Sequence, residues 1–314
     1  MALASVAAGT EPEFEYALPS DLAIRSLLLD VDRAGDRLVA VGAWGHVVLS
    51  DDDGLTWRQA RAVPTRRTLT SVSFPDAQHG WAVGHDAVVI HSGDGGETWV
   101  RQFDAAQDEA TLLSVWFEDA RHGFAVGSFG LMIETRDGGA TWSRRRLGKA
   151  GEEDPHLNEI FRGPEGSLFI AAEFGRVYRS MDGGATWARL ETGYEGSMWG
   201  GIALADGDLL VYGLRGHAFR SDDLGETWRE VETGTEQSIQ DASMLPGGVL
   251  ALVGLGGLME TSRDAGRSFE VGYVPDRRGI AAVTPGRGSE VLLFGEHGVR
   301  RRRISGELLP LPTL

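Results

Sequence analysis

The chain has 314 residues, of which 42% are hydrophobic, so it is long enough to bury a sizeable core in one large domain or two ordinary ones. Its formal net charge of −16 argues against a general binder of nucleic acid or of anionic membranes. It contains no cysteine, which excludes disulfides, thiolate metal sites and a cysteine nucleophile.

The chain begins with MALASVAAGTEPE, which is apolar for nine residues and has no Lys or Arg before them. This is not a complete signal peptide, although Ala-Leu-Ala-Ser resembles a small-residue cleavage site. We expect residues 1–13 to be a flexible segment and the protein to be periplasmic or otherwise exported, with the cytoplasm as the alternative. No apolar run approaches the roughly 18 residues of a membrane helix, so membrane insertion is not expected.

An eight-residue box recurs six times along the chain. The copy at 92–99 reads SGDGGETW, and the others begin at residues 50, 135, 180, 221 and 262, in steps of 41 to 45 residues. Before each box, a short apolar stretch runs into Gly-x-x-Gly or a near variant, as in WAVGHDA at 81–87. A seventh copy of this stretch, LLFGEHG at 292–298, has no box after it.

Each repeat contains several short apolar segments. In the second repeat there are four, at 69–74, 80–84, 87–92 and 98–103. Four strands per 41 to 45 residues, without helical periodicity, are typical of a β-propeller blade. The sequence therefore predicts an all-β fold, a seven-bladed β-propeller of four-stranded antiparallel blades with Asp-box turns, as one domain over residues 14–314.

The last repeat has no obvious fourth strand. Its first three strands are expected near 280–283, 291–295 and 299–304. The segment FEYAL at 14–18 precedes IRSLLL at 24–29, which is the expected inner strand of the first repeat. We expect residues 14–18 to supply the outer strand of the seventh blade, which would close the ring and remove an exposed edge. The C-terminal ELLPLPTL is the other candidate, although its two prolines are poor members of a strand ladder.

The box has the composition of a turn. Its Asp can accept hydrogen bonds from backbone amides of the same turn, its Gly allows positive φ, and its Trp offers a large apolar area for packing between blades. Six copies around a ring cannot all be one catalytic centre. We therefore expect a structural role for the box aspartates, which are Asp52, Asp94, Asp137, Asp182, Asp223 and Asp264.

The box S-x-D-x-G-x-T-W occurs here together with a longer unit, F-x-D-x-x-H-G-[WF]-A-V-G, at 74–84 and 117–127. This combination resembles the photosystem II assembly factor-like family of Asp-box (BNR repeat) propellers, in its non-photosynthetic bacterial form, over about residues 14–306. The resemblance implies a non-enzymatic propeller that binds other proteins and needs no cofactor. It also implies an accessory role for a membrane complex or a transporter of the RND type.

The alternative is a carbohydrate-binding or sialidase-like glycosidase propeller. A sialidase site needs an arginine cluster, a Tyr nucleophile with a Glu, and an acidic Asp. The F-R-I-P motif that is diagnostic of sialidases is absent, and the most similar segment is FRGP at 161–164. DDDG at 51–54 lacks the alternation of an EF-hand, and the eight histidines show no H-x-x-x-H or H-x-H spacing. We expect no enzyme and no metal site, with a calcium ion at one box as the alternative.

A binding surface is expected on the propeller face that carries the Gly-x-x-Gly turns and the loops that enter the inner strands. Its candidates in the turns are Trp44, His85, Phe129, Phe174, Arg215 and His297. Its candidates in the loops are Arg66, Arg67, Tyr194, Trp199, Arg277 and Arg278. Exposed aromatic residues beside arginines suit a protein or peptide partner; the alternative is ordinary loop residues with half-buried rings.

Inner-strand register also predicts which side chains line the central channel. These are Arg25, Thr70, Leu113, Asn158, Trp199, Gln240 and Gly279. The set contains no paired carboxylates and no nucleophile with a base, which argues against catalysis.

The third strand of the last repeat reads GVRRRRIS, so the arginines Arg300, Arg301, Arg302 and Arg303 stand where other repeats have Val, Ala or Met. One interpretation is that they pair with Glu11, Glu13 and Glu15 in a frayed closing blade. The other is a basic patch that docks an acidic partner or a lipid headgroup.

Overall fold

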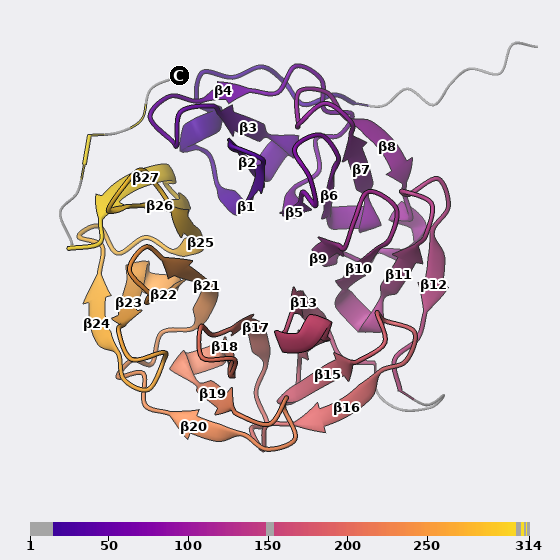
Figure 1. The fold of residues 1–314 in the computed structure, drawn as a ribbon. Helices are drawn as coiled ribbons and strands as arrows, with labels where there is room; N and C mark the ends of the chain where they lie inside the picture. Colours follow the sequence, from indigo (N-terminus) through magenta and orange to yellow (C-terminus); the bar gives the residue numbers. More distant parts are fainter. Residues whose placement is uncertain (1–14, 149–153, 306–308, 311, 313–314) are drawn as a thin grey trace, which may run out of the picture.

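The apolar segments of each repeat form the strands of one antiparallel sheet. The computed structural model describes residues 15–148, 154–305, 309–310 and 312. Within them, six four-stranded sheets and one three-stranded sheet stand around a common centre, and the first strand of each sheet is the innermost (Figure 1). This confirms the predicted seven-bladed propeller.

The strands follow one another outward within each blade. The first blade contains β1 (Leu28–Ala34), β2 (Arg37–Gly42), β3 (Val47–Ser50) and β4 (Arg58–Gln59). The second contains β5 (Leu69–Ser73), β6 (Gly80–Gly84), β7 (Val89–Ser92) and β8 (Val100–Phe103). The third contains β9 (Leu112–Phe117), β10 (Gly123–Gly127), β11 (Met132–Thr135) and β12 (Ser143–Arg145).

The remaining blades repeat this order. The fourth contains β13 (Leu157–Arg162), β14 (Leu168–Ala172), β15 (Arg176–Ser180) and β16 (Ala188–Glu191). The fifth contains β17 (Met198–Ala203), β18 (Leu209–Gly213), β19 (Ala218–Ser221) and β20 (Arg229–Val231). The sixth contains β21 (Ile239–Leu245), β22 (Val249–Gly254), β23 (Leu258–Ser262) and β24 (Glu270–Tyr273). The seventh contains β25 (Ile280–Pro285), β26 (Glu290–Gly295) and β27 (Gly298–Arg303).

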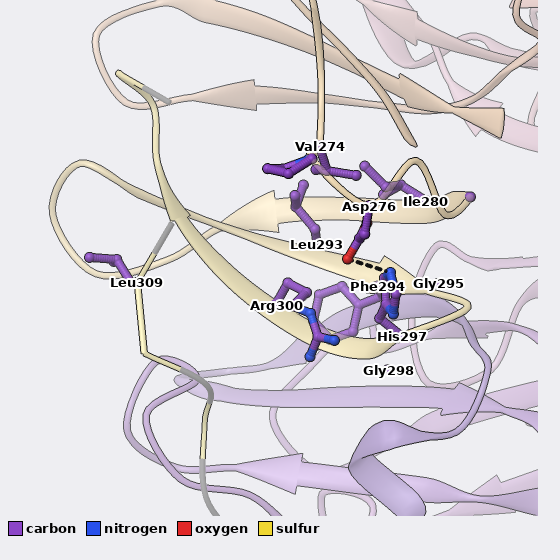
Figure 2. A pocket seen from close by; sticks show the side chains of 12 residues that line it. Val274, Asp276, Ile280, Leu293, Phe294, Gly295, His297, Gly298, Arg300 and Leu309 are labelled. Atoms are coloured by element: carbon purple, nitrogen blue, oxygen red, sulfur yellow. Dashed lines mark ion pairs between the residues drawn. The ribbon is translucent and has the colours of Figure 1, made fainter. Parts of the chain in front are cut away.

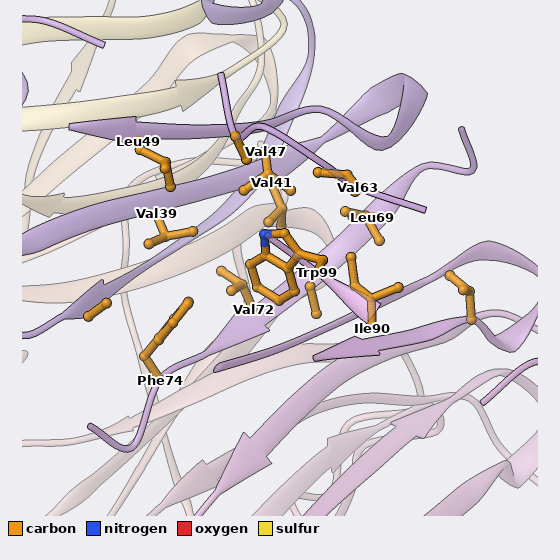
Figure 3. Packing of buried hydrophobic residues seen from close by; sticks show 14 residues of the cluster. Val39, Val41, Val47, Leu49, Val63, Leu69, Val72, Phe74, Ile90 and Trp99 are labelled. Carbon is orange, nitrogen blue, oxygen red and sulfur yellow. The ribbon is translucent and has the colours of Figure 1, made fainter. Parts of the chain in front are cut away.

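The hydrophobic core lies between the blades. Each buried cluster joins the facing surfaces of two neighbouring sheets, as around Trp99, where Val39 and Leu49 of the first blade meet Leu69 and Ile90 of the second (Figure 3). Because side chains alternate along each strand, every blade has two apolar faces, and stacking the blades in a ring buries both faces.

The predicted closure of the ring by residues 14–18 is wrong. Residue 14 lies outside the described residues, and residues 15–20 run beside the first blade and the loop that follows it, where the Ala17 N–H donates to the Val63 carbonyl at 2.9 Å. At the seventh blade, the described contact to the outer edge of β27 comes from the C-terminal segment, where the Leu309 N–H donates to the Arg301 carbonyl at 3.1 Å. The position of FEYAL before the first inner strand suggested a closing strand, but Tyr16 and Leu18 are exposed and belong to no strand.

Hydrophobic packing closes the ring instead. One buried cluster contains Leu38 and Trp57 of the first blade together with Leu292 and Phe294 of the seventh. The Trp57 and Phe294 rings meet edge to face with centroids 5.8 Å apart, which is a favoured aromatic geometry. The first and last blades therefore join by the same kind of interface as every other pair.

The inner strand of the first blade begins later than the apolar segment at 24–29 predicted. Residues Ala23–Arg25 form a short 3-10 turn (η1), and β1 starts at Leu28. In most inner strands, the ladder has a bulge just after the first residue, as between Leu28 and Asp30. The bulged residue leaves the pairing pattern, which turns its side chain toward the channel.

Candidate functional site

Each Asp-box closes a turn between the third and fourth strands of its blade. In the fifth blade, Asp223 accepts hydrogen bonds from the Thr227 N–H at 2.9 Å, the Thr227 hydroxyl at 2.6 Å and the Ser221 hydroxyl at 2.8 Å. These bonds hold the pKa of Asp223 at about 2. The other box aspartates Asp52, Asp94, Asp137, Asp182 and Asp264 accept the equivalent set. These bonds occupy each box carboxylate within its own turn, through one backbone N–H and two side-chain hydroxyls in the case of Asp223.

The opposite face of the ring carries the Gly-x-x-Gly turns and the loops that enter the inner strands, and we name it the turn face. Turn and loop are tied together, because the first residue of each turn donates its N–H to the carbonyl just before the inner strand, as His85 does to Thr68 at 3.0 Å. The turn glycine permits this approach: a Cβ on Gly84 would lie 2.1 Å from the Thr68 oxygen.

The tips of these turns hold residues in the left-handed backbone region. They are Trp44, Asp86, Phe129, Phe174, Arg215 and Gly256, with φ between 56° and 63°. Trp44 is 70% exposed, Phe129 67% and Phe174 39%. Left-handed backbone favours glycine and costs bulky residues about 1–2 kcal/mol. Three exposed aromatic side chains thus occupy positions where the fold itself would prefer glycine.

Neighbouring polar groups flank two of these aromatic rings. The Phe129 ring meets the His156 ring edge to face at 4.9 Å, and the Arg176 guanidinium lies 5.0 Å from the centre of the Phe174 ring. The predicted His85 is exposed beside the tip residue Asp86. These groups belong to the second, third and fourth blades of the turn face.

The predicted arginines of the turn face have different surroundings. Arg67 forms ion pairs with Asp86 at 2.7 Å and Asp104 at 2.8 Å, so it connects loops of the second blade. Arg66 donates to the Tyr16 carbonyl at 2.8 Å. Both arginine side chains therefore already interact with groups of this chain on the turn face.

The remaining predicted residues lie on the turn face around the fifth, sixth and seventh blades. Arg277 stacks on Tyr273 at 3.7 Å, and Arg278 lies 3.2 Å from His297. Tyr194 is half-buried against the His217 ring, with centroids 4.2 Å apart. Arg215 is exposed at its turn tip.

The channel contains a cavity of about 120 Å³, and five of the seven predicted lining residues border it: Thr70, Leu113, Asn158, Trp199 and Gln240. Arg25 and Gly279 do not; Leu29 and Ala281 take their places. The error follows from the late start of β1 and from an early start assumed for β25. Trp199 therefore lies in the channel and not on the turn face.

The prediction that the channel has no paired carboxylates is also wrong. Asp30, Glu159 and Asp241 border the cavity. Burial raises the pKa of Asp30 and of Asp241 to about 7, and burial with the charges of both raises the pKa of Glu159 well above its ordinary value. A sequence signal existed: they occupy one register position, two residues after the apolar residue that starts each inner strand.

These carboxylates join neighbouring blades. Glu159 accepts a 3.0 Å hydrogen bond from the Gly201 N–H, and Asp241 a 2.7 Å bond from the Val283 N–H. The Tyr212 hydroxyl lies 3.5 Å from Glu159, and the described residues that border the cavity include no arginine. Among the described residues, no group of three His, Asp or Glu side chains has the arrangement of a metal site.

The basic run of the last repeat divides between the two faces of its blade. Arg301 pairs with Glu290 at 2.7 Å, and Arg302 contacts the Met259 sulfur at 3.6 Å. Arg300 borders a separate cavity, and Arg303 ends β27 as an exposed residue. Of the expected acidic partners, Glu11 and Glu13 lie outside the described residues, and Glu15 is 3.6 Å from Arg66.

Fold and turns together define a seven-bladed Asp-box β-propeller. A family model described as photosynthesis system II assembly factor YCF48 matches residues 101–266, more than half of the chain. The chain therefore belongs to this family.

One relative matches this chain in sequence, and two solved structures match it in fold. Photosystem II assembly protein Ycf48 of Thermosynechococcus vestitus is 44% identical over 41 residues, a match that spans 12% of that protein's length. A solved structure of YCF48 bound to a D1 peptide has a TM-score of 0.73 at 18% identity, covering 96% of this chain and 99% of that one. YCF48 from Cyanidioschyzon merolae has a TM-score of 0.70 at 18% identity, covering 91% and 97%. At this identity, the two structures show the shared fold.

Proposed function

We propose that this chain is a non-enzymatic propeller that binds a protein partner through its turn face and serves as an assembly or accessory factor for a membrane-associated complex. Membership of the YCF48 family supports a protein-binding role. A structural relative is described with a bound D1 peptide, which favours a peptide segment as the part of the partner that is recognised. A transporter of the RND type is one such complex.

The observation that carries the proposal is the left-handed conformation of exposed aromatic residues. Trp44 has φ 61° and Phe129 has φ 56°, and each projects from a turn tip into solvent. The sixth blade builds the same turn with Gly256 at φ 63°. Since glycine serves the turn without strain, the aromatic rings contribute to something other than folding. Exposed Trp and Phe side chains are typical anchors of protein interfaces.

The channel supports the same proposal. Its carboxylates accept backbone hydrogen bonds between blades, and the lining residues that the structure describes include no arginine to hold a sugar acid. No helix within the described ranges is long and apolar enough to cross a membrane. We propose an exported, periplasmic location, which fractionation of the native organism tests.

The test uses the tagged full-length protein and extracts of the native organism's membrane and periplasmic fractions. The wild type is expected to retain a defined complex, which mass spectrometry identifies. The complex is then purified, and the wild type is expected to bind the purified complex as well. The double variant Trp44→Gly/Phe129→Gly is expected to lose it. Ala265→Gly is the matched control, because Ala265 also has left-handed backbone (φ 57°) but sits in an Asp-box turn on the opposite face. Equal capture by all three proteins would contradict the proposal, and selective retention of a glycan would favour the carbohydrate-binding alternative.

A further inference from the structure

A cavity of about 280 Å³ lies between the loop at 274–279 and the seventh blade, on the turn-face side of the molecule. Its walls are largely apolar and come from Val274, Ile280, Leu293, Phe294 and Leu309. Figure 2 shows Asp276 and His297 side by side at one end of the cavity, with Arg300 next to Phe294. An apolar cavity with a few polar groups at one end is the usual form of a binding site.

Arg300 is the polar group of this cavity for which the described part of the chain supplies no ionic partner. Among the described residues it forms no ion pair, and its hydrogen bond is a long 3.5 Å contact to the Val299 carbonyl. The next residue, Arg301, is in contrast neutralised by Glu290 at 2.7 Å. Burial and the nearby guanidinium groups of Arg278 and Arg25 lower the pKa of Arg300, while Asp276 opposes this.

The charges around the cavity leave room for one more anion. Asp276 is already paired with His297 at 2.8 Å, and Glu296 lies beside Gly279 at the edge of the turn. Against these two carboxylates stand the three guanidinium groups of Arg25, Arg278 and Arg300. A carboxylate brought to Arg300 would neutralise a half-buried cation, and such charge-assisted hydrogen bonds are stronger than neutral ones.

We propose that this cavity binds an apolar side chain of a partner peptide, and that an acidic residue next to it pairs with Arg300. The inference rests on the proposed function and adds a class of partner sequence: a hydrophobic residue flanked by Asp or Glu. The apolar walls would contribute most of the affinity, because burial of apolar surface is the main favourable contribution to association. Arg300 would select the acidic neighbour.

Synthetic peptides test the specificity on the unmodified full-length protein. The probe is acetyl-Gly-Ser-Phe-Asp-Gly-Ser-amide, followed through the backbone amide signals of Gly279, Gly295 and Gly298 in two-dimensional NMR spectra. These signals are expected to shift on titration. A peptide with Ala in place of Phe, and one with Lys in place of Asp, are each expected to bind at least about tenfold more weakly. Equal binding of the three peptides, or no shift at these glycines, would overturn the proposal.

Variants then assign the charge contact. Arg300→Gln is expected to weaken binding of the Phe-Asp peptide about tenfold and leave binding of the Lys peptide unaffected. It is expected to keep the wild-type Tm, because Arg300 forms no ion pair with any described residue. Arg300→Lys keeps the charge and is expected to restore part of the affinity. Arg229→Gln is the matched control; that side chain is 75% exposed and pairs with Asp222 on the fifth blade. Unchanged peptide binding by Arg300→Gln would refute the role of Arg300.

The outcomes separate this inference from the proposed function. Loss of the captured complex in Trp44→Gly/Phe129→Gly, with no peptide bound at the cavity, would leave the proposed function standing and reject the cavity. Peptide binding at the cavity, with capture of the complex unaffected by the turn-tip variants, would support the cavity and reject the assignment of the interface to those tips.

Discussion

The carboxylate of Asp30, on the inner strand of the first blade, accepts a 2.8 Å hydrogen bond from the Val72 N–H on the inner strand of the second. The same register position holds Ser71 and Ser114 in the next two blades, and their hydroxyls accept from Val115 at 3.3 Å and Ile160 at 3.2 Å. Side chains two residues into the inner strands therefore connect successive blades around the channel. Aspartate and serine perform the same connection, but only aspartate titrates.

The first prediction concerns the pH dependence of stability. Burial raises the pKa of Asp30 from 3.8 to about 7, so the folded protein binds more protons than the unfolded chain between these values. The free energy of unfolding should therefore decrease as pH rises from about 4 to about 7. Asp30→Ser keeps an acceptor for Val72 and removes the titration, so the decrease should become smaller by roughly 2–4 kcal/mol. Urea denaturation at pH 4.5, 6 and 7.5 measures it.

Asp30→Ala is the companion variant. It leaves the Val72 N–H without its partner and should cost about 1–3 kcal/mol at pH 4.5 relative to Asp30→Ser. Identical stability of the Ser and Ala variants would mean that the hydrogen bond between blades contributes nothing.

The second prediction concerns Glu260, which is fully buried in β23 and whose carboxyl oxygens have no hydrogen-bond partner among the described residues. Ile90 and Ile133 occupy the same position, two residues before the box, in other blades. Burial raises the pKa of Glu260 to about 8. Glu260→Ile should raise the free energy of unfolding at pH 7 by about 1–3 kcal/mol, because it removes a buried polar group without a partner.

The sign of the pH effect gives a control for Glu260. With a folded pKa above the unfolded value of 4.5, the wild type should lose stability as pH rises from about 4.5 to about 8. Glu260→Gln should make this loss smaller while keeping the shape of the side chain. A Gln variant with the same pH profile as the wild type would show that Glu260 does not titrate in this range.

The third prediction compares two adjacent aspartates of one box. Asp223 accepts three hydrogen bonds within its turn, whereas Asp222 is about half exposed and pairs with Arg229. Asp223→Ala should lower the free energy of unfolding by about 1–3 kcal/mol, and Asp222→Ala by less than about 1 kcal/mol. Because the folded pKa of Asp223 is depressed to about 2, its contribution should be present above about pH 4 and be lost as pH falls toward 2. Equal losses in the two variants would contradict the structural role of the box.

The fourth prediction separates folding from binding at the turn tips. Trp44→Gly relieves a left-handed backbone and removes a ring that is 70% exposed, so it should stabilise the protein by about 1 kcal/mol. Ala265→Gly should stabilise by a similar amount for the same reason. Thermal unfolding of the two variants checks this. A fall in Tm for Trp44→Gly alone would indicate that the ring packs on the protein, and would weaken its assignment to a partner.

Local features of the sequence predicted much of this structure. The hydrogen bonds of the Asp-box form within eight residues, so its role as a turn follows from its local sequence. Asp94 and Asp182 accept the same hydrogen bonds in different blades. Strand alternation and a repeat of 41 to 45 residues determined the number of blades. The turn-tip aromatics Trp44 and Phe129 were found because they stand in the recurring Gly-x-x-Gly turns.

Contacts between distant residues were decided only by the tertiary structure. Closure depends on Trp57 meeting Phe294, and the hydrogen bonds between blades join residues about 42 apart, such as Asp30 and Val72. The channel lining also depends on where each inner strand begins: register correctly predicted Trp199 in the channel, whereas Arg25 lies in η1, before the start of β1, and does not border the cavity. A repeat shows what each blade contains, because those interactions are local. The packing of one blade on the next determines which side chains become buried together, and so which carboxylates titrate and where a cavity remains.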